Sequence, residues 1–248
     1  MWLAGGVRLF LRSPAIWVVL LLILFAAMKV VNVIGILALV AVLLMPVFLA
    51  GLMDGCRAIE DGRELQIAHL LKGFQKNAAQ LVTIGGVSLV GNLIVAMIVF
   101  AIGGDAIATM AKALTKHATI TPQIAEQMQA VTMELTKALL IGAAASLPLL
   151  MALWFAPLLV YFHNVKPLEA MKLSFLACLK NALPMLLYGL IVLVVLMALV
   201  PIGIRLGHYD LGLWLMTPAL VPSIYVSYKD IFNAGRAVPA GGNNAFLK

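Results

Sequence analysis

Charge is scarce in this sequence. Asp, Glu, Lys and Arg make up only 11% of the 248 residues, whereas 64% are hydrophobic, and the mean hydropathy is +1.08. Soluble domains carry about 25% charged residues, so most of this chain must face lipid or other buried helices. The formal net charge of +7 is compatible with nucleic-acid binding. Basic residues that flank membrane spans explain it better, so we expect no nucleic-acid partner.

Cysteines and catalytic motifs are also scarce. Cys56 and Cys178 are the only cysteines, and both fall in segments that we expect on the cytoplasmic side, where thiols stay reduced. The four histidines show neither HExxH nor a paired His/Cys spacing typical of a metal site. Serine-hydrolase, Walker and Rossmann fingerprints are missing as well. We therefore expect a protein that is not an enzyme and carries no cofactor.

Long apolar runs dominate the chain. A membrane span needs about 20 apolar residues to cross about 30 Å of hydrocarbon. The stretches that qualify are 14–31, 33–53, 81–103, 138–162, 182–204 and 211–228. No small-residue cleavage site follows the first run, so we interpret it as an uncleaved span and not a signal peptide. The sequence thus predicts an all-α fold, a polytopic membrane bundle of six transmembrane helices forming one domain over 1–233.

The basic residues between the spans predict the orientation. One side would hold Arg8, Arg12, Arg57, Arg63, Lys72, Lys76, Lys166, Lys172, Lys180, Lys229, Arg236 and Lys248. The other would hold Lys29, Lys112, Lys116, Lys137 and Arg205. The positive-inside rule places the richer side, with both termini, in the cytoplasm of a bacterium, so the chain would be a multi-pass inner-membrane protein. Residues 234–248, rich in Gly, Asn and Ala, are predicted to be a disordered cytoplasmic tail.

The cytoplasmic connections have an amphipathic pattern. Within 165–180, one predicted face carries Leu168, Met171, Phe175, Cys178 and Leu179, and the opposite face carries Lys166, Glu169, Lys172 and Lys180. Within 65–76, Ile67, Leu70, Leu71 and Phe74 oppose Lys72, Gln75 and Lys76, and near the N-terminus Leu3, Val7, Phe10 and Leu11 oppose Arg8 and Arg12. Such helices lie in the membrane interface near anionic headgroups.

These helices supply the candidate lipid-headgroup contacts. They are Arg8, Arg12, Lys72, Lys76, Lys166, Lys172 and Lys180. The same pattern is also typical of cytoplasmic connectors that pack on a helical bundle without lipid specificity.

The three connections also suggest an internal repeat. Arg12-Ser13, Lys76-Asn77 and Lys180-Asn181 each close an interfacial helix before a span, and the second span of each unit carries Pro46, Pro157 or Pro218. This arrangement predicts a threefold parallel repeat of surface helix and helix hairpin. The middle unit contains a periplasmic insertion over 104–136. We expect a short amphipathic helix there, followed by a second helix that begins at Pro122 and runs into the fourth span.

Polar groups within the spans are few. No span carries a charged residue near its middle, which counts against a proton-coupled pump or a channel for charged solutes. Asn92 is the most polar residue inside a span, and a lone Asn there more often bonds a neighbouring helix than a ligand. Pro46, Pro157 and Pro218 would bend their helices and free carbonyls that could line a cavity. These four are our candidate intramembrane polar and kink positions.

Pairs of small residues four positions apart support close helix packing, either within the bundle or with another copy of the chain. They are Gly51 and Gly55, Gly142 and Ser146, and Gly203 and Gly207.

Several residues together resemble a known family. They are Trp2, Gly6, Leu9, Phe10, Pro14 and Trp17, the triplet 155–157, the runs 169–175 and 177–181, and the closing run 227–232. This pattern resembles an uncharacterised family of six-span bacterial inner-membrane proteins. The spacing of Ala170, Ser174 and Phe175 before Lys180-Asn181 is more distantly similar to the YciC-like proteins. It is also similar to the membrane domain fused to some glycerophosphodiester phosphodiesterases, whose catalytic domain is absent from this sequence. The resemblance implies a six-span helical fold and no established activity.

Two function classes follow from the sequence. The first is a lipid-interacting or scaffold protein of the cell envelope, in contact with anionic headgroups and with a protein partner or a second copy. The alternative is a carrier or channel for a neutral or amphiphilic small molecule. A carrier would need a water-accessible cavity that reaches the middle of the membrane near Asn92.

Overall fold

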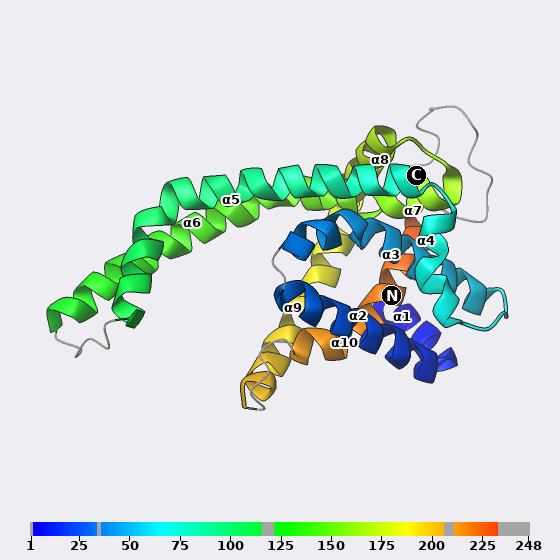
Figure 1. The fold of residues 1–248 in the computed structure, drawn as a ribbon, viewed down its shortest axis with the longest axis horizontal. Helices are drawn as coiled ribbons and strands as arrows, with labels where there is room; N and C mark the ends of the chain where they lie inside the picture. The colour runs from blue at the N-terminus through cyan, green and yellow to red at the C-terminus, as the bar shows by residue number, and fades with distance from the viewer. Residues whose placement is uncertain (1, 34–35, 116–121, 206–210, 233–248) are drawn as a thin grey trace. The chain divides into compact units, whose positions relative to one another are not determined.

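The computed structural model describes residues 2–33, 36–115, 122–205 and 211–232. All elements within these ranges are helical, which confirms the predicted all-α class (Figure 1). In chain order they are α1 (Trp2–Arg12), α2 (Pro14–Val33), α3 (Ile36–Glu60), the 3-10 helix η1 (Ile67–Leu71), α4 (Lys72–Gln75), α5 (Ala78–Thr115), α6 (Pro122–Trp154), α7 (Ala156–His163), α8 (Pro167–Lys180), α9 (Ala182–Arg205) and α10 (Leu211–Phe232). The predicted tail over 234–248 lies outside the described residues.

Five segments of the described chain are long and apolar enough to cross a membrane. They are Pro14–Val31, Leu37–Glu60, Ala78–Lys112, Met128–His163 and Ala182–Arg205. The predicted sixth span, 211–228, is helical and lies in α10, but it is not among the five. Its two prolines, its serines and its tyrosines lower the hydropathy of this helix. The count of six spans therefore stays a prediction.

The two central helices are longer than the predicted spans. Helix α5 has 38 residues and α6 has 33. The first helix expected in the insertion is not separate, because α5 continues without a break to Thr115. The contact with α6 continues as well, since a Cβ on Gly103 would lie 2.8 Å from the Cβ of Ala138. The second expected helix is confirmed: α6 begins at Pro122 and includes the start of the fourth span.

The chain forms two compact units, a division that the predicted single domain over 1–233 did not include. The first unit comprises the described residues of Met1–Gly86 and Met151–Lys248, and the second comprises Val87–Leu150. In the second unit, α5 and α6 run side by side (Figure 1). A Cβ on Gly91 would meet the Leu149 side chain at 2.6 Å, and one on Gly142 would meet Val99 at 2.3 Å. Glycines thus set the spacing of this hairpin, as in many membrane helix pairs.

The core of the first unit gathers at one set of helix ends. Its wholly buried side chains come mainly from the start of α2, the middle and second half of α3, the start of α5, most of α7, the inner face of α8 and the end of α10. Among the largest in this core are Trp17, Leu20, Val47, Met53, Leu81, Phe155, Leu158 and Tyr228. These are the ends for which the charge pattern predicts a cytoplasmic location. By contrast, the most apolar 18-residue window of α9 has no buried residue. The spans therefore present aliphatic surfaces outward, as lipid-facing helices do.

Helix α1 packs closely against α10. A Cβ on Gly6 would lie 2.5 Å from the Ala219 carbonyl oxygen, so only glycine allows this approach. The Trp2 indole N–H donates a hydrogen bond to Asp230 Oδ2 at 2.8 Å. A helix is therefore present where the sequence predicted the first interfacial helix, with one face buried against α10, and its location in the interface stays a prediction.

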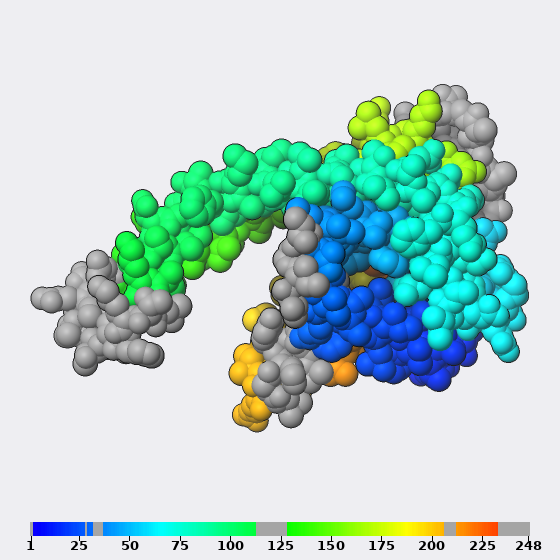
Figure 2. Space-filling model, in the orientation of Figure 1, coloured from blue at the N-terminus to red at the C-terminus, as the bar shows by residue number. Residues whose placement is uncertain are grey.

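The expected amphipathic helix over 65–76 is not a single helix. It consists of the 3-10 turn η1 followed by one α-helical turn, α4, and only Leu70 of its predicted apolar face is buried. The cause is close backbone contact with α3: a Cβ on Gly51 would lie 2.3 Å from the His69 carbonyl oxygen, and one on Gly73 would lie 2.0 Å from that of Val47. Figure 2 shows this cyan segment beside the blue surface of α2 and α3.

Candidate functional site

Helix α8 is held by its ends and by a face of small residues. Pro167 occupies its first turn, Glu169 lies near its N-terminus and Lys180 lies in its last turn, an order that suits the helix dipole. Its buried residues are Ala170, Leu173, Ser174, Ala177 and Cys178. The predicted apolar face was therefore wrong in part, since Leu168 is 80% and Leu179 55% exposed. Small side chains allow close approach to α7, and this turns the leucines outward.

The outward face of α8 combines leucines with lysines. Leu168 and Leu179 lie on the exposed surface of the same helix as Lys166, Lys172 and Lys180, which are all exposed. Lysine stems can lie along an apolar layer while their ammonium groups reach the headgroups. This mixture is what a helix lying in the membrane interface presents to lipid.

Helix α1 has a similar outer surface. Val7 and Leu11 are exposed, as are Arg8 and Arg12. Arg12 Nη1 donates to the Ile59 carbonyl oxygen at 3.5 Å, which ties the end of α1 to the end of α3. Apolar and basic groups are thus presented together on a second helix of the same unit.

The seven predicted headgroup contacts lie on three segments: α1, η1–α4 and α8 with its N-cap. Six of them are exposed, and Lys72, the first residue of α4, is half-buried. Lys76 is the C-cap of α4, and its Nζ lies 5.4 Å from the centre of the Tyr161 ring.

A basic and aromatic cluster was missed by the sequence analysis. The Arg57 guanidinium lies 5.6 Å from the Phe162 ring centre, and the rings of Tyr161 and Phe162 pack edge to face at 5.2 Å. His163 shares a hydrogen bond with the hydroxyl of Tyr228. Arg57 lies in the last turn of α3, where its Nε is 3.9 Å from Asp61 Oδ2. Its aromatic partner is more than a hundred positions away in the chain, and no local pattern predicts that contact.

Two asparagines hold this cluster together. Asn77 Nδ2 donates to the Val160 carbonyl oxygen and to Asn164 Oδ1, each at 2.8 Å. Both asparagines have a φ of +56°, a left-handed conformation that Asn tolerates better than most residues. The start of α5 is thereby fastened to the end of α7.

The ends of α3 and α10 are joined by polar contacts. Glu60 accepts a hydrogen bond from the Tyr225 hydroxyl at 2.9 Å and pairs with Lys229 at 2.5 Å. Together with the contact between Trp2 and Asp230, this links α1, α3 and α10 at the same helix ends.

The candidate intramembrane positions have mainly local contacts. Asn92 Nδ2 donates to the carbonyl oxygen of Ser88 at 2.8 Å, within its own helix and not across to a neighbour. Helices α3 and α10 continue through Pro46 and Pro218. Pro157 lies in the first turn of α7, directly after the interruption between α6 and α7. Of the three prolines, only Pro157 accompanies a helix end.

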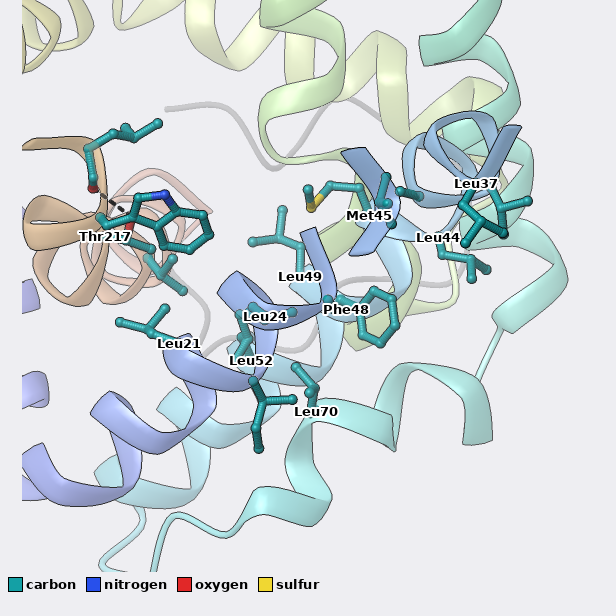
Figure 3. Close-up of a pocket in the computed structure, with 18 residues that line it drawn as sticks. Leu21, Leu24, Leu37, Leu44, Met45, Phe48, Leu49, Leu52, Leu70 and Thr217 are labelled. Carbon is teal, nitrogen blue, oxygen red and sulfur yellow. Dashed lines mark hydrogen bonds between the residues drawn. The ribbon is translucent and has the colours of Figure 1, made fainter. Parts of the chain in front are cut away.

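An apolar groove of about 520 Å³ lies in the first unit between α2, α3, η1 and α10 (Figure 3). Its walls include Leu21 and Leu24 of α2, Leu44, Met45, Phe48, Leu49 and Leu52 of α3, Leu70 of η1, and Trp214, Thr217 and Val221 of α10. The Thr217 hydroxyl donates to the Leu213 carbonyl oxygen at 2.8 Å. Asn92, near which a carrier would need its cavity, belongs to the second unit and does not line this groove.

Both thiols are buried. Cys56 is 0% and Cys178 1% exposed. Burial raises the pKa of the Cys178 thiol to about 12, although its hydrogen bond with Ser174 opposes this shift. A thiol with such a pKa is a poor nucleophile and metal ligand near neutral pH. Across the described parts of the chain, no group of three or more His, Cys, Asp and Glu side chains could hold a metal ion.

Comparison with known proteins gives one relative of note. The chain is 29% identical over 252 residues to a probable inner membrane protein of Burkholderia thailandensis, and the alignment covers 93% of this chain and 89% of the relative. No family model matches the chain, and no solved structure matches it. With its five apolar helices, the likeness identifies the chain as a transmembrane protein.

Proposed function

We propose that this protein is an integral inner-membrane protein of the cell envelope that binds anionic lipid headgroups at the cytoplasmic leaflet. In this proposal both termini lie in the cytoplasm and six spans cross the bilayer. Helices α1 and α8 and the η1–α4 segment lie at the inner surface. The protein contributes lipid contact or an accessory, scaffolding role, with no chemical step of its own.

The outward face of α8 carries the proposal. Leu168 and Leu179 point away from the bundle. Exposing these apolar side chains to water is unfavourable, whereas contact with lipid is not. Lys166, Lys172 and Lys180 flank them. Near an anionic leaflet each such charge contributes about 1 kcal/mol of attraction, so three lysines supply enough energy to favour acidic lipids over zwitterionic ones.

Helix α10 has the dimensions of the sixth span. Its 22 residues give a length of about 33 Å, since each residue of an α-helix advances the chain by about 1.5 Å. Leu213 and Leu215 are exposed in its first half, while Tyr225, Tyr228 and Phe232 are buried in its second half. This suits a helix whose first half faces lipid and whose second half packs in the cytoplasmic-side core.

Three matching junctions support the threefold repeat. In each, one or two residues separate a short helix from the next long helix: α1 from α2, α4 from α5, and α8 from α9. The junction residues are Ser13, Asn77 and Asn181. Their carbonyl oxygens accept hydrogen bonds from the N–H groups of Trp17, Leu81 and Met185, at 3.2, 3.0 and 3.0 Å. The same backbone hydrogen bond thus occurs where the sequence predicted equivalent positions, although φ is +56° at Asn77 and −108° at Asn181.

Lipid analysis of the purified protein tests the proposal. The protein is extracted from its native membrane in polymer-bounded nanodiscs, and the acidic fraction of the co-extracted phospholipid is compared with that of the bulk membrane. The variant K166Q/K172Q/K180Q removes three cytoplasmic-side charges from α8. The matched control, K112Q/K137Q/R205Q, removes three charges from the opposite predicted side.

We expect the wild type and the control to be enriched in acidic phospholipid and the α8 variant to approach the composition of the bulk membrane. Equal enrichment in all three would show that α8 is a structural connector without lipid preference. A protein partner that co-purifies with the wild type and the control and is lost only from the α8 variant would assign α8 to the scaffold role instead.

A further inference from the structure

We propose that the apolar groove between α2, α3, η1 and α10 binds one acyl chain of a membrane phospholipid. This deepens the proposed lipid-interacting function by adding a chain-binding site to the headgroup contacts, and it rests on that function. The groove shares no residue with the seven headgroup candidates.

The chemistry of the walls excludes polar occupants. The lining side chains are aliphatic or aromatic except for Thr217, whose hydroxyl is already bonded to the Leu213 carbonyl oxygen. Most of the lining comes from α2 and α3, within the segments long and apolar enough to cross a membrane. A cavity of this kind does not hold water, since a bound water needs two to four polar partners. In a bilayer the abundant apolar molecule is the lipid chain.

The walls favour a single chain over a helix from a second copy. On α3 the lining runs from Leu37 to Leu52, a length of about 22 Å at 1.5 Å per residue. The walls also consist mostly of Leu, Val, Ile, Met and Phe, whereas membrane helices approach each other through small residues.

One end of the groove carries a cation and aromatic rings. Trp214 lines the groove and packs edge to face with Phe25, with ring centres 4.6 Å apart. Lys29 Nζ lies 4.9 Å from the centre of the Phe25 ring. Tryptophan and lysine are typical of the membrane interface, so the phosphate of the bound lipid lies at this end, near the C-terminal end of α2. The charge pattern assigns this end to the periplasmic leaflet.

Photo-crosslinking tests the inference on the unaltered protein. The purified protein is reconstituted into phosphatidylglycerol vesicles that contain a small fraction of phosphatidylglycerol with a diazirine in its acyl chain. After irradiation, the modified residues are mapped by peptide mass spectrometry. We expect crosslinks at lining positions of α3 and α10 to exceed, per residue, those on the exposed surface of α9, which serves as the reference for ordinary lipid contact.

A matched pair of variants sharpens the test. A41W fills the groove, and A198W places the same side chain on the exposed surface of α9. Because the chain would lose several buried methylenes, we expect about a tenfold loss of groove crosslinks in A41W and none in A198W. Uniform labelling of α3, α9 and α10 in the wild type would overturn the inference without needing any variant. So would a change of oligomeric state in A41W alone, which would assign the groove to a second copy.

The two proposals can fail separately. If K166Q/K172Q/K180Q loses acidic lipid while the groove shows no excess of crosslinks, the headgroup function stands and the acyl-chain site falls. If the groove is labelled and the α8 variant keeps its acidic lipid, the acyl-chain site stands and the basic helix has no lipid preference.

Discussion

The Ser174 hydroxyl accepts a hydrogen bond from the backbone N–H of Phe155 at 2.9 Å. The same hydroxyl donates to the Met151 carbonyl oxygen at 2.7 Å. In an uninterrupted helix these two backbone groups would bond to each other, four residues apart. A side chain of α8 has therefore entered the hydrogen-bond ladder between α6 and α7, one of the recognised causes of a sharp helix break.

Removing this hydroxyl should destabilise the protein. S174A leaves the buried N–H of Phe155 without its partner, at a cost of about 1–3 kcal/mol for such an unsatisfied group. The Met151 carbonyl oxygen keeps only the weaker contact from the Cys178 thiol at 3.6 Å. Thermal unfolding in detergent should show a midpoint lower by several degrees. S146A is the control, because that hydroxyl bonds only to Ala143 of its own helix. Equal midpoints for the two variants would show that the break forms without Ser174.

Neighbouring glycines on α5 should respond differently to alanine. A Cβ on Gly85 would lie 2.2 Å from the Leu43 carbonyl oxygen, whereas one on Gly86 would meet only the Leu43 side chain at 3.9 Å. G85A must push α5 away from α3, and such overpacking costs about 1–3 kcal/mol. G86A should be neutral or slightly stabilising, since alanine favours helix over glycine. The same unfolding assay compares them, and a G85A protein as stable as G86A would contradict the contact between α3 and α5.

The left-handed conformation at Asn77 can be separated from its hydrogen bonds. N77G keeps a residue that adopts positive φ freely and loses both bonds to α7, whereas N77A also pays about 1–2 kcal/mol for the left-handed backbone. We expect stability to fall in the order wild type, N77G, N77A. If N77A equals N77G, the backbone at this junction does not need the left-handed conformation.

Neither native thiol should react in the folded protein. Because the pKa of Cys178 is raised to about 12, its thiol stays protonated from pH 7 to pH 9, and both cysteines are buried. A membrane-permeant maleimide should therefore label the wild type only after denaturation. An added cysteine in L179C has an exposed site and an ordinary pKa of about 8.5, so its labelling should rise across this pH range. Rapid labelling of the folded wild type would show that the core of the first unit opens.

The helices and most of the spans follow from local hydropathy, which is why the sequence predicted them. A membrane requires every backbone group to be satisfied within its own segment, so a long apolar run becomes a helix whatever surrounds it. The start of α6 at Pro122 was also predictable from local sequence, because proline favours the first turn of a helix. The sixth stretch is a weaker case, because polar and proline residues dilute its apolar character.

The features that could not be predicted depend on which helix surfaces pack against each other in the folded protein. The face of α8 that contains Ala170 and Ala177 is weakly apolar and was assigned no packing role, yet its small size makes it the buried one. The 3-10 form of η1 follows from its contact with Gly51 of α3. The sequence marked Gly51 as a close-packing position, but it did not reveal the segment that packs there. The pairing of Arg57 with Phe162 likewise depends on tertiary structure, and no spacing rule reveals it.

The position of the outer face of α8 relative to the bilayer is the most direct test of the account. Spin labels are attached at L168C and L179C, and at R63C as the exposed loop control. In vesicles of acidic lipid, we measure how strongly oxygen and a water-soluble nickel complex relax each label. We expect oxygen to relax the two α8 labels more strongly than nickel does, and the reverse at R63C. Labels on α8 that respond like R63C would place this helix in water and contradict its role at the lipid surface.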